Sequence, residues 1–126
     1  MKSGAYKENI KLDNFKMSIA KVDLSGTPGI QYKWMDNQNK PVAEFTSFDW
    51  WDGKNIENLR VNDNYKKQGL SYQILDYATK TIGCKFLAVN KDNEVAKHVY
   101  DKYGFIVSEE DTNKYYMKLK IRRKFL

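Results

Sequence analysis

A stretch near the middle of the chain combines the residue types that could hold a phosphate. Residues 59–71 read Leu-Arg-Val-Asn-Asp-Asn-Tyr-Lys-Lys-Gln-Gly-Leu-Ser, so an apolar alternation passes through a polar turn into an amphipathic segment. This pattern predicts a strand, a loop and the first turn of a helix. The backbone N–H groups of such a turn are unsatisfied and lie at the positive end of the helix dipole. With Lys66 and Lys67 beside them, they predict a site for a phosphate or pyrophosphate.

A second set of polar and aromatic residues belongs to the helix expected after residue 92. Asp92 or Asn93 could cap this helix, and Gly104 could end it. Ala96 and Tyr100 are four residues apart and share one stripe of the helix. An aromatic residue on such a stripe usually packs in a core, so this block alone does not indicate catalysis.

The counts of cysteine and histidine exclude other kinds of site. Cys84 is the single cysteine and His98 the single histidine, which excludes an intramolecular disulfide and leaves no zinc site. We expect Cys84 to be a small buried residue at the start of a strand. We expect His98 to be exposed to solvent.

A mixed α+β fold must position these residues. Apolar alternation predicts strands at 15–23, 30–35, 42–51 and 56–61, which form an antiparallel meander. Helical spacing predicts helices at 70–82 and 93–103 on either side of a short strand at 85–89, and two strands follow at 105–108 and 115–121. The order of strand, helix and strand implies one right-handed parallel crossover within a mostly antiparallel sheet, with helices on its faces.

The bulk composition bounds the organisation of the chain and its partners. Its 126 residues predict a single domain spanning residues 1–126. No apolar run approaches the roughly 18 residues of a membrane span, and no signal-peptide segment begins the chain, so we expect a cytoplasmic protein. The net charge of +6 favours an anionic ligand or partner, such as nucleic acid, an acidic protein surface or a phosphorylated cofactor, over a polyamine substrate.

The two blocks together resemble the GNAT superfamily of acetyl-CoA-dependent N-acetyltransferases. The segment from Tyr65 to Ser71 is similar to the family's Arg/Gln-x-x-Gly-x-Gly/Ala pyrophosphate loop. The segment from Asn93 to Phe105 is similar to its Asn-x-x-Ala-x-x-x-Tyr-x-x-x-Gly-Phe helix. The resemblance covers roughly residues 40–120. It implies a GNAT-like sheet, with acetyl-CoA as co-substrate and no metal.

The resemblance also implies roles for the matched residues. Tyr100 matches the general acid that protonates the coenzyme A thiolate, and its alternative is a core aromatic. Asn93 would lie near the pantetheine arm, and its alternative is a helix cap. The backbone of Leu59 and Val61 would bind pantetheine, and the backbone of residues 67–71 the pyrophosphate. The implied cofactor-binding residues are Leu59, Val61, Lys66, Lys67, Gln68, Gly69, Leu70, Ser71 and Asn93.

The general base is less well determined than the acid. An amine of lysine type has a reference pKa of about 10.4, so a group or a water chain must take its proton at neutral pH. Glu57 is our candidate, because regular alternation places it on the same face of its strand as Leu59 and Val61. Family members with a glutamate on the fifth strand carry it where this chain has Ala88. The alternative for Glu57 is a solvated carboxylate.

The chain also departs from the family pattern. Lys66 replaces the usual arginine or glutamine, and Ser71 the usual glycine or alanine. Only residues 24–29 separate the first two expected strands, so the two helices that usually wall the acceptor site are missing. An open acceptor side suits a protein or peptide amine, or completion by a second subunit in a homodimer. The alternative is a GNAT-fold module without catalysis that binds nucleic acid or a protein through its basic surface, including residues 122–124.

Overall fold

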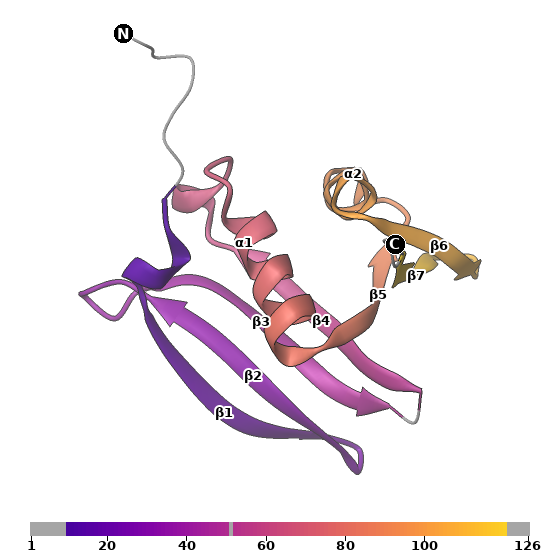
Figure 1. Cartoon of the computed structure of the whole chain (residues 1–126), viewed down its shortest axis with the longest axis horizontal. Coiled ribbons are helices and arrows are strands. Elements are labelled where there is room, and N and C mark those ends of the chain that lie inside the picture. Colours follow the sequence, from indigo (N-terminus) through magenta and orange to yellow (C-terminus); the bar gives the residue numbers. More distant parts are fainter. Residues whose placement is uncertain (1–9, 51, 121–126) are drawn as a thin grey trace, which may run out of the picture.

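Seven strands of the described residues, 10–50 and 52–120, form one sheet in the order β1-β2-β3-β4-β5-β7-β6 (Figure 1). In this computed structural model, β4 and β5 are parallel and every other neighbouring pair is antiparallel. The mixed, mostly antiparallel sheet expected from the sequence is therefore confirmed. The strands are β1 (Lys16–Leu24), β2 (Thr27–Met35), β3 (Pro41–Trp50), β4 (Gly53–Val61), β5 (Cys84–Asn90), β6 (Phe105–Glu110) and β7 (Lys114–Leu119).

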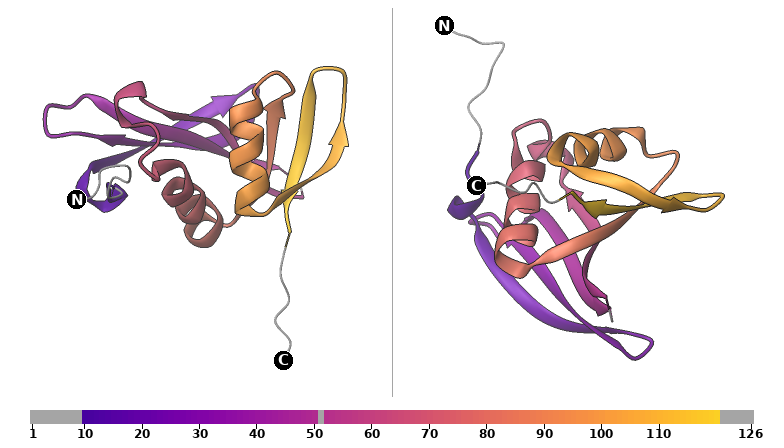
Figure 2. Two further views of the ribbon diagram at one scale, coloured as in Figure 1. Left: turned by 90° about the horizontal axis from the view of Figure 1, so that it is seen from above. Right: turned by 45° about the vertical axis from the view of Figure 1, so that its right-hand side comes forward.

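Both longer helical segments lie on the same face of the sheet (Figure 2). The connections from β4 to β5 and from β5 to β6 step the same way along the sheet, so two right-handed crossovers put their helices on one side. The Tyr103 hydroxyl joins them by donating to Asp76 Oδ1 at 2.6 Å. None of the helices among the described residues is long and apolar enough to cross a membrane. The helical elements are η1 (Leu12–Asn14), η2 (Asp63–Tyr65), α1 (Leu70–Asp76), its π-helical continuation η3 (Tyr77–Ile82) and α2 (Glu94–Tyr103).

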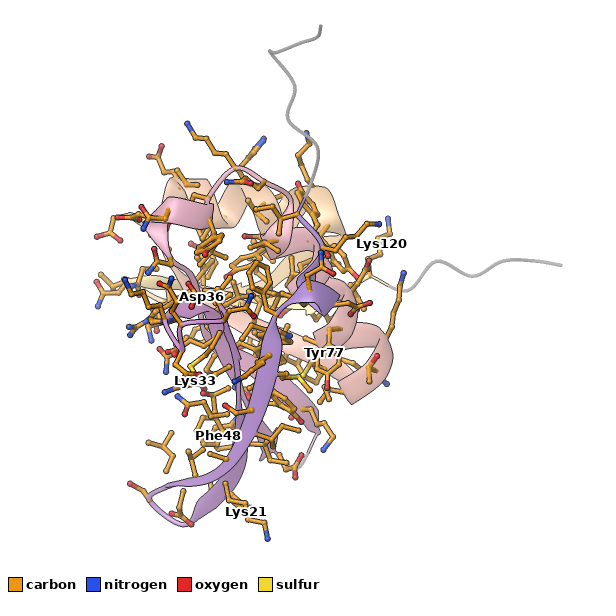
Figure 3. The ribbon with its side chains drawn as sticks, turned by 90° about the vertical axis from the view of Figure 1, so that its left-hand side faces the viewer. Lys21, Lys33, Asp36, Phe48, Tyr77 and Lys120 are labelled. Carbon is orange, nitrogen blue, oxygen red and sulfur yellow. The ribbon has the colours of Figure 1, made fainter. Side chains whose placement is uncertain are left out.

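Aromatic side chains fasten the helical layer to β2 and β3. Tyr32 stacks on Phe45 with their ring centroids 4.9 Å apart. Tyr77 of η3 meets Tyr32 and Trp34 edge-on at 5.8 and 5.6 Å. In Figure 3 Tyr77 lies on the side of the β1–β2 edge where the helices are, and Lys33 lies on the other side. The buried core thus occupies one face of the sheet.

The opposite face of the sheet carries no helix among the described residues.

A tight turn joins β1 to β2, with Ser25 and Gly26 at φ values of 51° and 91°. Positive φ at both central residues is the geometry of a two-residue hairpin turn whose twist matches that of the strands. No helix separates the first two strands, as the sequence predicted.

The predicted facing of residues in β4 is wrong, because the strand contains a bulge. Asn58 has a φ of 55°, and the pairing with β3 shifts from Glu57 opposite Thr46 to Arg60 opposite Glu44. One extra residue in β4 reverses the alternation beyond it. Leu59 therefore packs against the core, whereas Glu57 points to the open face.

Candidate active site

β4 and β5 pair at one end only and then separate. Their register contains Lys54 opposite Cys84, Asn55 opposite Phe86 and Ile56 opposite Leu87. β4 then continues to Val61 and β5 to Asn90 along diverging paths (Figure 1). Backbone groups on the facing edges lose their partners where the strands separate, so these edges can bind an extended ligand that supplies donors and acceptors.

A cavity of about 820 Å³ lies at this separation. The end of β4, the following loop, the start of α1 and one side of α2 form its walls. The two sequence blocks therefore meet around one space, although residues 72–92 separate them in the sequence. The expected site residues that line it are Leu59, Val61, Lys66, Lys67, Gly69, Leu70, Ser71, Asn93 and Tyr100.

The loop before α1 lines the cavity and contains two residues in a left-handed conformation. Lys67 and Gly69 both have left-handed φ values, of 64° and 84°. Such values are unusual for a lysine, and they turn successive peptide groups sharply. Leu70, only 1% exposed, anchors the loop to the core where the helix begins. Lys66 is exposed and forms an ion pair with Asp63 at 2.9 Å.

Asn93 and Tyr100 bring α2 to the same cavity. Asn93 Oδ1 accepts a hydrogen bond from the Ala96 N–H at 3.2 Å, so the helix-cap alternative for Asn93 is confirmed, and its side chain also lines the cavity. Tyr100 is 8% exposed and packs edge-on against Phe105. Burial raises the pKa of the Tyr100 phenol, which keeps it protonated at neutral pH. Among the described residues none hydrogen-bonds to this hydroxyl, so it remains available as a donor.

Glu57 and Gln68, by contrast, do not line the cavity. Glu57 directly follows Ile56, which pairs with β5, so it lies where the two strands part. Its side chain faces the open side of the sheet, where Asn55 Nδ2 donates to Glu57 Oε2 at 2.8 Å. A ligand in the cavity and a group beside Glu57 would therefore approach the point where β4 and β5 part from opposite faces of the sheet.

Sequence reasoning missed several residues of the cavity wall. Val95 and Val99 of α2 both line the cavity, although neither was predicted to belong to the site, and Val95 is 78% exposed. The signal available in the sequence was an apolar stripe on this helix that is wider than packing against the core requires. Cys84 behaves as expected, since it is fully buried at the start of β5. The other cavity residues that were not predicted are Arg60, Tyr65, Tyr72 and Ala96.

Residues 28–119 match the family model described as an acetyltransferase (GNAT) domain. The chain belongs to the GNAT family. By class this GNAT protein is an acyl-CoA-dependent N-acetyltransferase, with acetyl-CoA as its co-substrate. No group of three or more potential metal ligands occurs in the part of the chain that the structure describes.

Solved structures agree with this assignment at the level of the fold. A Klebsiella pneumoniae protein assigned as an acyl-CoA N-acyltransferase has a TM-score of 0.63 at 14% identity, covering 82% of this chain and 96% of that one. The Campylobacter jejuni N-acetyltransferase PseH in complex with acetyl coenzyme A has a TM-score of 0.56 at 23% identity, covering 73% of this chain and 67% of that one. The dodecameric spermidine N-acetyltransferase of Vibrio cholerae has a TM-score of 0.57 at 14% identity, covering 72% of this chain and 64% of that one. No curated protein sequence matches the chain.

Proposed function

We propose that this GNAT protein transfers the acetyl group of acetyl-CoA to a primary amine, and that a protein or peptide is its favoured acceptor. The observation that carries the proposal is the cavity beside the unpaired end of β4, which is lined both by the loop that contains Lys66 and Lys67 and by the buried Tyr100. Acceptor preference is inferred from the opposite face of the sheet, which no described helix covers. An uncovered face leaves room for an acceptor larger than a small molecule.

The cavity residues fit the co-substrate by their chemistry. The free edge of β4 at Leu59 and Val61 can pair with the amide groups of pantetheine, as one strand pairs with another. The backbone N–H groups from Lys67 to Ser71 can donate to the pyrophosphate, with Lys66 and Lys67 as positive charges. Tyr100 would protonate the leaving thiolate, since its phenol is buried, neutral and without a described partner.

Binding of acetyl-CoA is tested by isothermal titration with two matched tryptophan variants. Val95→Trp enlarges an exposed side chain on the cavity wall, whereas Ile106→Trp enlarges an exposed side chain of β6 outside the cavity. We expect the wild type to bind acetyl-CoA with a Kd below about 1 mM, Ile106→Trp to match it, and Val95→Trp to lose binding. Absence of binding by the wild type would contradict the proposal, and equal binding by both variants would place the ligand elsewhere.

Acceptor preference is tested by thiol release from acetyl-CoA in the presence of a lysine-containing peptide, spermidine or an amino sugar. The net charge of +6 disfavours a polycation such as spermidine, so we expect the peptide to give the highest kcat/KM. A higher value for spermidine would overturn the peptide preference and leave amine acetylation intact.

A GNAT-fold module without catalysis is the second candidate. The ion pair between Lys66 and Asp63 favours this candidate, because Asp63 neutralises one of the two lysines that would otherwise attract the pyrophosphate. The basic residues 122–124 that also motivated it lie outside the described part of the chain. This candidate predicts salt-sensitive binding to an oligonucleotide and a melting temperature that does not respond to coenzyme A. A rise in melting temperature with coenzyme A would exclude it.

A further inference from the structure

Asn55 connects the centre of the sheet to Glu57. It precedes Glu57 by two residues, so both side chains face the open side of β4, and Asn55 is only 9% exposed. The backbone N–H of Phe48 in β3 donates to Asn55 Oδ1 at 2.9 Å. Asn55 Nδ2 in turn donates to Glu57 Oε2 at 2.8 Å. Both polar atoms of the buried amide are thus used.

The donors and acceptors in this chain of hydrogen bonds allow one arrangement only. A backbone N–H can only donate, so it must meet the amide oxygen of Asn55 and not its nitrogen. The NH₂ group is then directed to Glu57, whose ionised carboxylate can only accept. A flipped amide would set two donors against each other at Phe48 and two acceptors at Glu57. Asn55 therefore holds one specific oxygen of Glu57 in place.

The held carboxylate lies at the point where β4 and β5 cease to pair. Ile56 pairs with β5, Glu57 comes next, and the bulge at Asn58 follows. Phe48 belongs to β3, which is paired on both sides, so the anchor of the hydrogen-bond chain is a fixed part of the sheet. Among the described residues none hydrogen-bonds to Glu57 Oε1, which leaves this oxygen available to an amine on the open face.

We infer that Asn55 is a positioning residue for acetyl transfer, which fixes the Glu57 carboxylate so that its second oxygen can take the amine proton. This inference rests on the proposed function. In the transfer step the amine nitrogen forms a bond to the acetyl carbon and the carbon–sulfur bond breaks. The amine proton passes to Glu57, and the thiolate takes a proton from Tyr100. Misplacement of a catalytic group by about 1 Å can cost a hundredfold in rate, so fixing one oxygen has a measurable effect.

The inference is tested by a double-mutant cycle in turnover. Asn55→Asp keeps an oxygen that accepts from the Phe48 N–H, but it replaces the NH₂ donor with a second acceptor, which cannot bond to the Glu57 carboxylate. The side chain in Asn55→Thr is too short to reach Glu57. We expect each to lower kcat about tenfold or more, with the Kd of acetyl-CoA changed less than twofold. In a Glu57→Gln background the same changes should lower kcat less than twofold further, because the carboxylate is already gone. Asn37→Asp, at an exposed turn, is the matched control and should leave kcat unchanged.

Four results would overturn the inference. These are wild-type kcat in the Asn55 variants, an equal loss in both backgrounds, full turnover by Glu57→Gln, or an unchanged Asn55 side-chain amide NMR signal on Glu57→Gln substitution. The NMR measurement needs only the wild type and Glu57→Gln, so it still decides if the Asn55 variants do not fold. Failure of the proposed function is distinguishable, since the wild type would then release no thiol with any amine while the NMR signals still report the Asn55 contact.

Discussion

Two tyrosines of α2, three residues apart, have hydroxyl groups in opposite situations. Burial raises the pKa of both Tyr100 and Tyr103. The Tyr103 hydroxyl is bonded to Asp76 at 2.6 Å and lies 2.9 Å from the Thr79 hydroxyl, whereas the Tyr100 hydroxyl has no partner among the described residues. A bonded hydroxyl stabilises the fold, whereas a hydroxyl without a described partner, on a residue that lines the cavity, is free to donate. This difference makes Tyr100 the better candidate for proton transfer.

We predict that Tyr100→Phe lowers kcat about a hundredfold while the Kd of acetyl-CoA changes less than twofold. Loss of general acid catalysis typically costs between 10²- and 10⁴-fold, whereas the ring that lines the cavity remains. Thiol release and isothermal titration measure the two quantities. Tyr103→Phe removes a hydroxyl from the same helix outside the cavity and should keep wild-type kcat. Equal turnover in Tyr100→Phe and wild type would remove Tyr100 from the acid role.

At the scale of the elements, the Tyr103 hydroxyl is the polar link between α2 and the helix formed by α1 and η3. Burial and the hydrogen bond to Asp76 raise the pKa of Tyr103 to about 12. The folded state therefore favours the neutral phenol more than the unfolded state does, whose tyrosines titrate near pH 10. This contribution to stability is complete below about pH 10 and is lost as the pH rises toward about 12.

Tyr103→Phe is accordingly predicted to lower the free energy of unfolding by about 1–2 kcal/mol at pH 7. The difference between wild type and variant should shrink between pH 10 and pH 12, because only the wild type loses this contribution there. Urea unfolding at pH 7, 10 and 11 measures it. A difference that is constant with pH would mean that the hydroxyl does not link the two helices in the folded state.

The elements that sequence reasoning found are those whose pattern is local. Alternation of apolar residues located the first four strands, and glycines 83 and 104 end the two helical segments as expected. The bulge at Asn58 has no such signal, although asparagine tolerates a left-handed backbone better than most residues. The bulge decides that Leu59 and Val61, which follow it, lie on the face opposite to Glu57. The role of Asn55 depends on the register of β3 against β4, which no local pattern specifies.

At the scale of the whole molecule, the sheet separates two environments. The helices and the cavity lie on one face, and the face that carries Glu57 has no described helix over it. Beyond Ile56 and Leu87 the strands β4 and β5 are no longer paired, and the proposed reaction places the two reactants on either side of this point. In the proposed reaction the co-substrate and the amine therefore meet through the sheet, so neither has to pass the other. The acceptor side can then change in size without altering the cavity.

Acetyl-CoA could be attracted by the net charge of +6 of the whole molecule or held by direct contact with the loop before α1. Lys66→Gln and Lys80→Gln form a matched pair. Each removes one positive charge and one exposed ion pair, with Asp63 and Asp76 respectively, but only Lys66 lines the cavity. General attraction by the net charge would respond equally to both, because each substitution lowers the net charge by one.

We predict that Lys66→Gln weakens acetyl-CoA binding about three- to tenfold, which is about 1 kcal/mol. Lys80→Gln should change the Kd less than twofold. The affinity of Lys66→Gln should also fall less steeply between 50 and 500 mM salt than that of the wild type, because one fewer charge contacts the phosphates. Isothermal titration over this salt range measures both effects. Equal losses in the two variants would assign the attraction to the net charge, and the loop would then hold the pyrophosphate through its backbone alone.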